Sequence, residues 1–228
     1  MLAPELSDPA RFRALQAAWR ERGRLRVEGF LQADDAEALQ AELREQPFEL
    51  RVPGQGEFLS MQYWEFPLTP AREAEVPRCV AFLRWFYAAG RSWLGELTGR
   101  ALAPPIDDKV IATLYAKGCY LDTHNDAREG RSLAFVLGLT RDRWPPEEGG
   151  HLEYLRFAEG RLEVSERCAP GWNTLDIFPA DPAPLHRIPL VREQRERRAI
   201  TGWFEAASSA EASPESGRLE LERAGEQG

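Results

Sequence analysis

The sequence predicts a mainly β fold with helical support (α+β), in which an antiparallel double-sheet barrel carries N-terminal helices on its outside. Up to about residue 103 the apolar residues recur at helical spacing, whereas after Pro104-Pro105 they alternate or form short runs bounded by Gly and Pro. Helices followed by many short strands are typical of such a barrel. We therefore expect a helical part with an aromatic loop (1–103), a barrel core (104–206) and a mobile tail (207–228) that is poor in apolar residues.

The N-terminal part is predicted to begin with a helix. Ser7 or Asp8 can cap it, Pro9 suits its first turn, and Gly23 can end it. The other elements expected here are a short strand from Leu25 through Phe30, a helix beginning at Asp34 or Asp35, and a helix from about Pro77 to Gly99.

The segment from Val52 to Pro77 is rich in Gly and Pro but also in aromatic residues. Such a loop can close one side of the core as a hairpin, or it can cover the barrel mouth as a substrate lid, and the sequence leaves both open. If it lines a groove, Tyr63 and Trp64 are the candidate substrate-binding residues.

The barrel is predicted from five runs that have the period or composition of strands. These runs are Val110 to Tyr115, Ser132 to Leu139, His151 to Phe157, Thr174 to Phe178, and Arg198 to Phe204. Gly and Pro turns separate them, so antiparallel neighbours are expected.

Composition narrows the range of partners. The net charge of −8 and the pI of about 5.1 leave no broad basic face, so no nucleic-acid partner is expected. Three widely spaced cysteines indicate reduced thiols and a cytoplasmic location. We also expect no signal peptide and no membrane association, because no stretch has the required apolar length. The oligomeric state stays open.

Two of the three histidines fall into a metal-ligating pattern. His124 and Asp126 are two residues apart, so on a strand end they can face one metal while Asn125 points away. His186 would arrive from another strand. Two histidines and one carboxylate form the facial triad of non-haem Fe(II) enzymes, which leaves three coordination positions open. Zinc is the competing metal, but it favours three or four His or Cys ligands.

A cation follows this triad. Arg197, Ala199, Thr201 and Trp203 would share one face of the final strand. A guanidinium on the interior face needs a carboxylate, and the distal carboxylate of 2-oxoglutarate suits its planar fork. Thr201 and Tyr115 could add hydroxyl contacts. The alternative is that Arg197 belongs to a solvated, charged strand start, and that Tyr115 is a core residue.

The remaining histidine, His151, follows a Gly-Gly turn. Because the triad is complete without it, we expect His151 to be exposed or structural.

Several motifs in the second half of the chain can be taken together. They are Tyr115-x-x-Gly118-x-x-Leu121-x-x-His124-x-Asp126, Gly149-Gly150-x-Leu152, Trp172-Asn173 and Arg197-Arg198-Ala199-Ile200-Thr201-Gly202-Trp203-Phe204. In these motifs the chain resembles the 2-oxoglutarate- and Fe(II)-dependent dioxygenases of the prolyl-hydroxylase branch, and especially the group that hydroxylates a proline in a ribosomal protein. The resemblance covers residues 110 to 206, and 24 to 46 weakly.

This resemblance implies a double-stranded β-helix (jelly-roll, cupin-like) barrel. It implies Fe(II) at His124, Asp126 and His186, 2-oxoglutarate at Arg197 and Tyr115, and dioxygen as cosubstrate, with ascorbate as the reductant in vitro. This chain departs from the pattern of these relatives in two ways, and both concern the substrate. The eukaryotic relatives carry a second barrel-like domain, for which this chain is too short. Animal oxygen-sensing relatives place a second tyrosine near the position of Gly138.

The function expected from these features is hydroxylation of an unactivated C–H bond, in the manner of a prolyl 3- or 4-hydroxylase acting on a protein. Asp126 argues against a halogenase, which keeps a small residue there so that chloride can bind. A small-molecule substrate, such as a free amino acid or a natural-product intermediate, is the first alternative. A barrel that binds a peptide or a metal without turnover is the non-enzymatic alternative.

Overall fold

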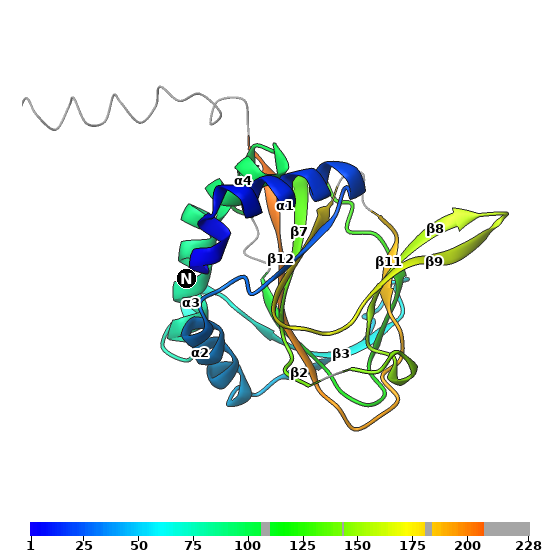
Figure 1. Cartoon of the computed structure of the whole chain (residues 1–228). Coiled ribbons are helices and arrows are strands. Elements are labelled where there is room, and N and C mark those ends of the chain that lie inside the picture. The colour runs from blue at the N-terminus through cyan, green and yellow to red at the C-terminus, as the bar shows by residue number, and fades with distance from the viewer. Residues whose placement is uncertain (106–109, 143, 181–183, 208–228) are drawn as a thin grey trace, which may run out of the picture.

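The computed structural model describes residues 1–105, 110–142, 144–180 and 184–207. Within them, twelve antiparallel strands form one curled sheet, and the helices cover the outer face of one side (Figure 1). The predicted mainly β fold with outer helices is therefore confirmed. The expected mobile tail lies outside the described residues from residue 208 onward.

The helices are 3-10 helix η1 (Pro4–Ser7), α1 (Pro9–Arg22), α2 (Ala33–Arg44), 3-10 helix η2 (Pro70–Arg72), α3 (Pro77–Trp85), π-helix η3 (Phe86–Gly90), α4 (Arg91–Thr98) and 3-10 helix η4 (Pro146–Glu148). The strands are β1 (Leu25–Glu28), β2 (Glu49–Arg51), β3 (Met61–Pro67), β4 (Leu102–Ala103), β5 (Ile111–Tyr115), β6 (Tyr120–His124), β7 (Arg131–Leu139), β8 (Leu152–Ala158), β9 (Arg161–Cys168), β10 (Trp172–Pro179), β11 (His186–Ile188) and β12 (Arg197–Ala206). None of the described helices is long and apolar enough to cross a membrane.

The sheet has the order β1-β10-β7-β12-β5-β3-β6-β11-β8-β9. Strand β3 is its turning point, because Trp64–Pro67 pairs with β5 and Met61–Gln62 pairs with β6. The two halves of the sheet thereby face each other across an interior. Strand β2 pairs with β3, so of the two alternatives left open for this segment the hairpin is present, and the segment assigned to a loop contains a barrel strand.

The first helix is built as its sequence predicts. The Asp8 side chain accepts hydrogen bonds from Ala10 N–H and Arg11 N–H, and Gly23 ends the helix with φ +65°. The second helix begins one residue earlier than predicted, at Ala33, and Gln32 at its N-cap makes no side-chain bond.

The third predicted helix is interrupted. It is divided into α3 and α4 by the π-helical turn Phe86–Gly90. A side chain at Gly90 would place a Cβ 2.7 Å from the Phe86 ring, so the glycine allows that ring to pack against its own helix. Gly99 then ends α4 with φ +70°, where the sequence predicts the end.

Aromatic side chains join the helical layer to the sheet. The Phe86 ring lies 4.8 Å from Phe135 of β7 and 5.2 Å from Phe204 of β12, and it stacks on Phe82 at 5.1 Å (centroid distances). All four rings are at most 1% exposed. Burial of each stabilises the fold by about 1.5–3 kcal/mol, so this cluster fixes the two central strands against the helices.

The five predicted strands are present, with ends shifted by one or two residues. Strands β6, β9 and β11 were not predicted as runs. Strand β9 is mostly polar and exposed at the sheet edge, and β11 has only three residues between prolines, so neither has the alternation on which sequence patterns depend.

Asn173 connects the start of β10 to the chain after β1. It has φ +53° at a register shift in the pairing with β7, and it is 6% exposed. Its Oδ1 accepts from Leu31 N–H (2.8 Å), its Nδ2 donates to Leu31 O (2.7 Å), and its carbonyl accepts from Phe30 N–H (3.0 Å). One side chain therefore satisfies a backbone donor and a backbone acceptor of a buried neighbour.

Asn173→Ala should lower the free energy of unfolding by about 2–4 kcal/mol, because Leu31 loses both partners and alanine tolerates positive φ poorly. Equilibrium urea unfolding measures this loss. Asn173→Gly relieves the backbone strain and loses only the bonds, so its loss should be smaller. A loss below about 1 kcal/mol for alanine would show that the link is dispensable.

Candidate metal centre and its cavity

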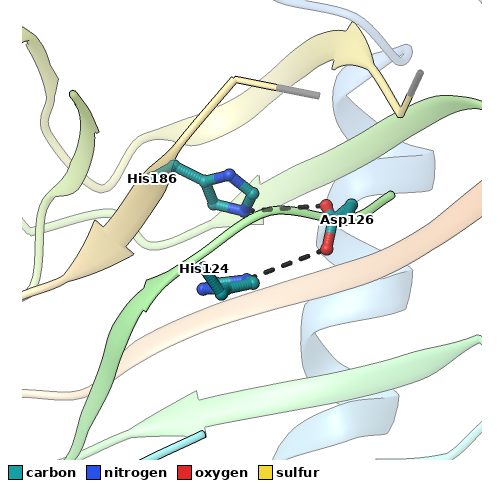
Figure 2. Close-up of side chains that lie close together, drawn as sticks. All are labelled: His124, Asp126 and His186. Atoms are coloured by element: carbon teal, nitrogen blue, oxygen red, sulfur yellow. Dashed lines mark ion pairs between the residues drawn. The ribbon is translucent and has the colours of Figure 1, made fainter. Parts of the chain in front are cut away.

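His124, Asp126 and His186 come together at one point of the interior. The Nε2 atom of His124 lies 3.7 Å from Asp126 Oδ1, and that of His186 lies 3.6 Å from Asp126 Oδ2. Figure 2 shows both imidazole rings turned toward this carboxylate. One ligand atom from each residue lies within 4.8 Å of the other two, and this is the only such group of His, Cys, Asp or Glu side chains in the described chain.

Both histidines are held in the tautomer that a metal requires. His124 Nδ1 lies 2.8 Å from the carbonyl of Asp122, and His186 Nδ1 lies 2.9 Å from the carbonyl of Pro184. A carbonyl can only accept, so each Nδ1 must donate, and in a neutral ring this leaves the lone pair on Nε2. Backbone partners of this kind orient metal-binding histidines. Burial, followed by the neighbouring His124, lowers the pKa of His186, which favours its neutral form.

The short strand β11 brings His186 to His124. It lies between β6 and β8, with His186 opposite His124 on one side and opposite Tyr154 on the other. Beside it, buried Glu153 accepts from Arg187 of β11 (2.8 Å) and from Arg167 of β9 (2.7 Å). Burial alone raises the pKa of Glu153, but these two bonds outweigh it and leave that pKa lowered. The ionised carboxylate thus ties the histidine-bearing strand to β8 and β9.

Arg197 opens β12 opposite Tyr115 of β5. It is 5% exposed, and no carboxylate in the described chain forms an ion pair with its guanidinium, which lies 5.1 Å from the centroid of the Tyr115 ring. Burial lowers the pKa of Arg197, although an arginine stays charged in proteins. A buried cation without an anion is costly, so this position suits a ligand that carries a carboxylate.

Tyrosines form the wall beside this cation. Tyr115 is 2% exposed and stacks on Tyr63 of β3, with ring centroids 5.2 Å apart and an interplanar angle of 21°. Burial raises the pKa of both phenols, so they stay protonated and can donate. Thr201 lines the same interior four residues after Arg197, as the strand alternation predicts.

These groups share one cavity of about 450 Å³ between the two halves of the sheet. The predicted residues that line it are Tyr63, Tyr115, His124, Asp126, His186, Arg197 and Thr201. Its volume lies within the usual range for small-molecule sites. The metal-ligating cluster and the unpaired guanidinium therefore face the same space.

Two sequence expectations differ in detail. Asn125, expected to point away, also lines the cavity. Trp64, paired with Tyr63 as a substrate candidate, does not line it and is 37% exposed. His151, expected to be exposed or structural, is buried, its Nδ1 lies 2.9 Å from Gly149 O, and it is not part of the cluster.

The sequence reasoning did not single out the charged residues of the cavity wall. Arg51, Glu57 and Arg131 line it, and the Arg131 guanidinium lies 3.7 Å from the centroid of the Trp203 ring. Trp203 could have been found from its shared strand face with Arg197. The three charged residues follow turns or short strands, which have no pattern that marks a site.

The donor set fits Fe(II) and 2-oxoglutarate. Two neutral Nε2 atoms and one carboxylate can hold three corners of an octahedron, and Arg197 in the same cavity can bind a distal carboxylate. No third histidine or cysteine joins the cluster within the described residues, as zinc would favour.

Comparisons with known proteins agree with this geometry. The family model described as the 2OG-Fe(II) oxygenase superfamily, in which 2OG is 2-oxoglutarate, matches residues 110–205. Prolyl 3-hydroxylase OGFOD1 of Mus musculus is 30% identical over 131 residues, which are 56% of this chain and 24% of that protein. The chain thus matches about a quarter of the length of this relative.

Solved structures show the same fold. A prolyl-4-hydroxylase of Pseudomonas putida superposes with a TM-score of 0.61 at 24% identity, over 86% of this chain and 100% of that one. A prolyl hydroxylase of Trichoplax adhaerens, in complex with a hypoxia inducible factor peptide fragment, gives 0.63 at 15% identity, over 86% and 89%. The predicted double-stranded β-helix is confirmed by these structures, and residues 110–205 match the family model of the 2OG-Fe(II) oxygenase superfamily.

Proposed function

We propose that this protein is an Fe(II)- and 2-oxoglutarate-dependent hydroxylase whose substrate is a prolyl residue of a protein. One observation carries the proposal: a buried guanidinium without a carboxylate partner in the described chain faces the same cavity as a His-Asp-His cluster. A metal site alone would not need that cation, and a cation alone would not need the cluster.

The proposed metal ligands are His124 Nε2, His186 Nε2 and one Asp126 oxygen. Fe(II) bound there would supply the redox chemistry that couples decarboxylation of 2-oxoglutarate to oxygen insertion into a C–H bond. The chain contributes orientation, because the Asp122 and Pro184 carbonyls fix both rings. Three protein ligands leave the other positions free for the cosubstrates.

The proposed cosubstrate contacts are Arg197, Tyr115 and Thr201. The planar guanidinium can bind the distal carboxylate through two parallel hydrogen bonds, and burial strengthens such a pair by excluding water. The Tyr115 phenol can donate to the same carboxylate since its raised pKa keeps it protonated. Thr201 is placed to add a hydroxyl contact.

The proposal of a protein substrate is supported by relatives that are prolyl hydroxylases. It is also supported by the wall formed by β2, β3 and their connection, where Tyr63 and Leu59 line the cavity while Phe58 is fully exposed. Leu50 and Trp64, which are cross-strand partners on β2 and β3, are exposed as well, and adjoining exposed apolar residues are typical of a surface that meets a partner. Three buried, unpaired cysteines are consistent with the expected cytoplasmic setting.

A small-molecule substrate is the second candidate. A cavity of about 450 Å³ can enclose a free amino acid or a natural-product intermediate together with the cosubstrate. The two candidates differ in whether residues outside the cavity contribute to turnover.

The test is 2-oxoglutarate turnover with Fe(II), ascorbate and oxygen, followed by mass spectrometry of a lysate for products heavier by one oxygen atom. Wild type should release succinate and add oxygen to a prolyl peptide. His124→Ala and Asp126→Ala should abolish turnover with the fold intact, and should weaken Fe(II) binding in an anaerobic titration. Unchanged iron affinity in both variants would show that His124 and Asp126 do not bind the metal.

Replacing Arg197 with Lys keeps the charge but removes the planar fork. We expect the KM for 2-oxoglutarate to rise at least about tenfold, on the order of 1.4 kcal/mol, with iron affinity nearly unchanged. Arg198→Lys is the matched control, because Arg198 does not line the large cavity and its side chain instead donates to Glu196 (2.7 Å) and to the Leu43 carbonyl. A larger rise in KM for Arg198→Lys than for Arg197→Lys would show that Arg198, and not Arg197, binds the distal carboxylate.

Two substitutions distinguish the contribution of the cavity wall to turnover from that of the outer surface. They are Tyr63→Ala in the wall and Trp64→Ala on the surface. For a protein substrate, we expect Trp64→Ala to slow product formation without changing basal succinate release, since remote contacts supply binding energy. Tyr63→Ala should affect both, because Tyr63 stacks on Tyr115. Coupled product and succinate are measured for each variant. If Trp64→Ala keeps the wild-type ratio of product formed to succinate released, a small-molecule substrate is favoured.

A further inference from the structure

A second, much smaller cavity lies behind Arg197. Its volume is about 10 Å³, which is close to the space that one water molecule needs. Arg197 lines both this cavity and the large one, so it is a residue that the two cavities share. The polar side chains around the small cavity include Thr174 and Asp176 of β10, which are 1% and 4% exposed.

The Thr174 hydroxyl has no hydrogen-bond partner within the described chain, although its oxygen is fully buried. A buried hydroxyl without a partner costs about 1–3 kcal/mol, and such groups in native proteins are usually satisfied by ordered water. This side chain lines the small cavity, as Arg197 does. The hydroxyl therefore needs an acceptor or donor that the cavity can hold.

Small residues create this space. Gly138 of β7 lies between Thr174 of β10 and Ala199 of β12 in the sheet register. A Cβ at Gly138 would lie 2.6 Å from Thr174 Oγ1 and 2.8 Å from the Gly171 carbonyl. The other β7 residue that lines the cavity, Val136, is apolar, so β7 supplies no polar side chain here, whereas β10 supplies Thr174 and Asp176.

Asp176 is a negatively charged residue near Arg197, but both of its carboxylate oxygens already accept hydrogen bonds. Both of its oxygens accept from Arg26 of β1, at 2.8 and 2.7 Å. Its negative charge favours the charged form of Arg197, but the fork of Arg197 stays free for a ligand. Two guanidinium groups, the half-buried one of Arg26 and the buried one of Arg197, lie around one carboxylate, so one positive charge is left unmatched.

We propose that the small cavity binds one ordered water that bridges the Thr174 hydroxyl and the Arg197 guanidinium, which makes Thr174 a positioning residue for 2-oxoglutarate. Asp176 supplies the third polar neighbour, and buried waters commonly have about three. The water holds the rear N–H groups of the guanidinium, so the front edge faces the large cavity. The identity of the ligand rests on the proposed function, whereas the water site does not.

The test compares wild type, Thr174→Val and Thr174→Ser, each loaded with Mn(II) in place of Fe(II). Valine has the shape of threonine without the hydroxyl, and serine keeps the hydroxyl. Calorimetry should give a Kd for 2-oxoglutarate that rises about tenfold in Thr174→Val and stays within about twofold of wild type in Thr174→Ser. Mn(II) affinity should be the same in all three.

A role in packing alone makes the opposite prediction. If the hydroxyl has no water, Thr174→Val removes an unsatisfied group, so its melting temperature should rise while the Kd stays unchanged, and that result overturns the proposal. Wild type that fails to bind 2-oxoglutarate would contradict the proposed function instead. A high-resolution crystal structure of wild type then decides the water site: density between Thr174 Oγ1 and Arg197 supports it, and a dry cavity overturns it. If Thr174→Val does not fold, the wild-type crystal structure alone decides whether the water is present.

Discussion

The buried charge of Arg197 is the constraint on which the rest of the site depends. It lies at the start of a central strand and is 5% exposed, with its guanidinium 5.1 Å from the centroid of the Tyr115 ring and with no ion pair in the described part of the chain. Removing a guanidinium from water is unfavourable unless an anion replaces the water. Under the proposed function, an acid bound in the cavity that Arg197 and Tyr115 line would supply that anion.

The curled sheet brings the His-Asp-His cluster into the same cavity as this charge. His124 and His186 are far apart in sequence, and β11 becomes the neighbour of β6 because β3 carries the sheet from one half to the other. Backbone carbonyls fix both rings, so the cluster depends on loop geometry as much as on residue type. The helices contribute indirectly, since their aromatic cluster holds β7 and β12 in place.

Sequence reasoning predicted the helices, the principal strands and the His124, Asp126 and His186 grouping, because periodicity and residue spacing are local properties. It assigned Met61–Pro67 to a loop, since flanking Gly and Pro hid a strand whose partners are distant in sequence. It could not find the polar cavity behind Arg197. That cavity depends on Gly138 lying between two strands that are adjacent only in the folded sheet. The role of each site residue stays a prediction.

The most direct test of the central claim compares two ligands on the unmodified protein. The wild type is loaded with Mn(II), and calorimetry measures the Kd of 2-oxoglutarate and of 2-oxopentanoate, which has the same chain length but lacks the distal carboxylate. If Arg197 is a buried cation that requires a ligand acid, 2-oxopentanoate should bind at least about a hundredfold more weakly, since a lost partner for a buried charge costs about 3–5 kcal/mol. Equal affinities would show that the guanidinium does not select the ligand.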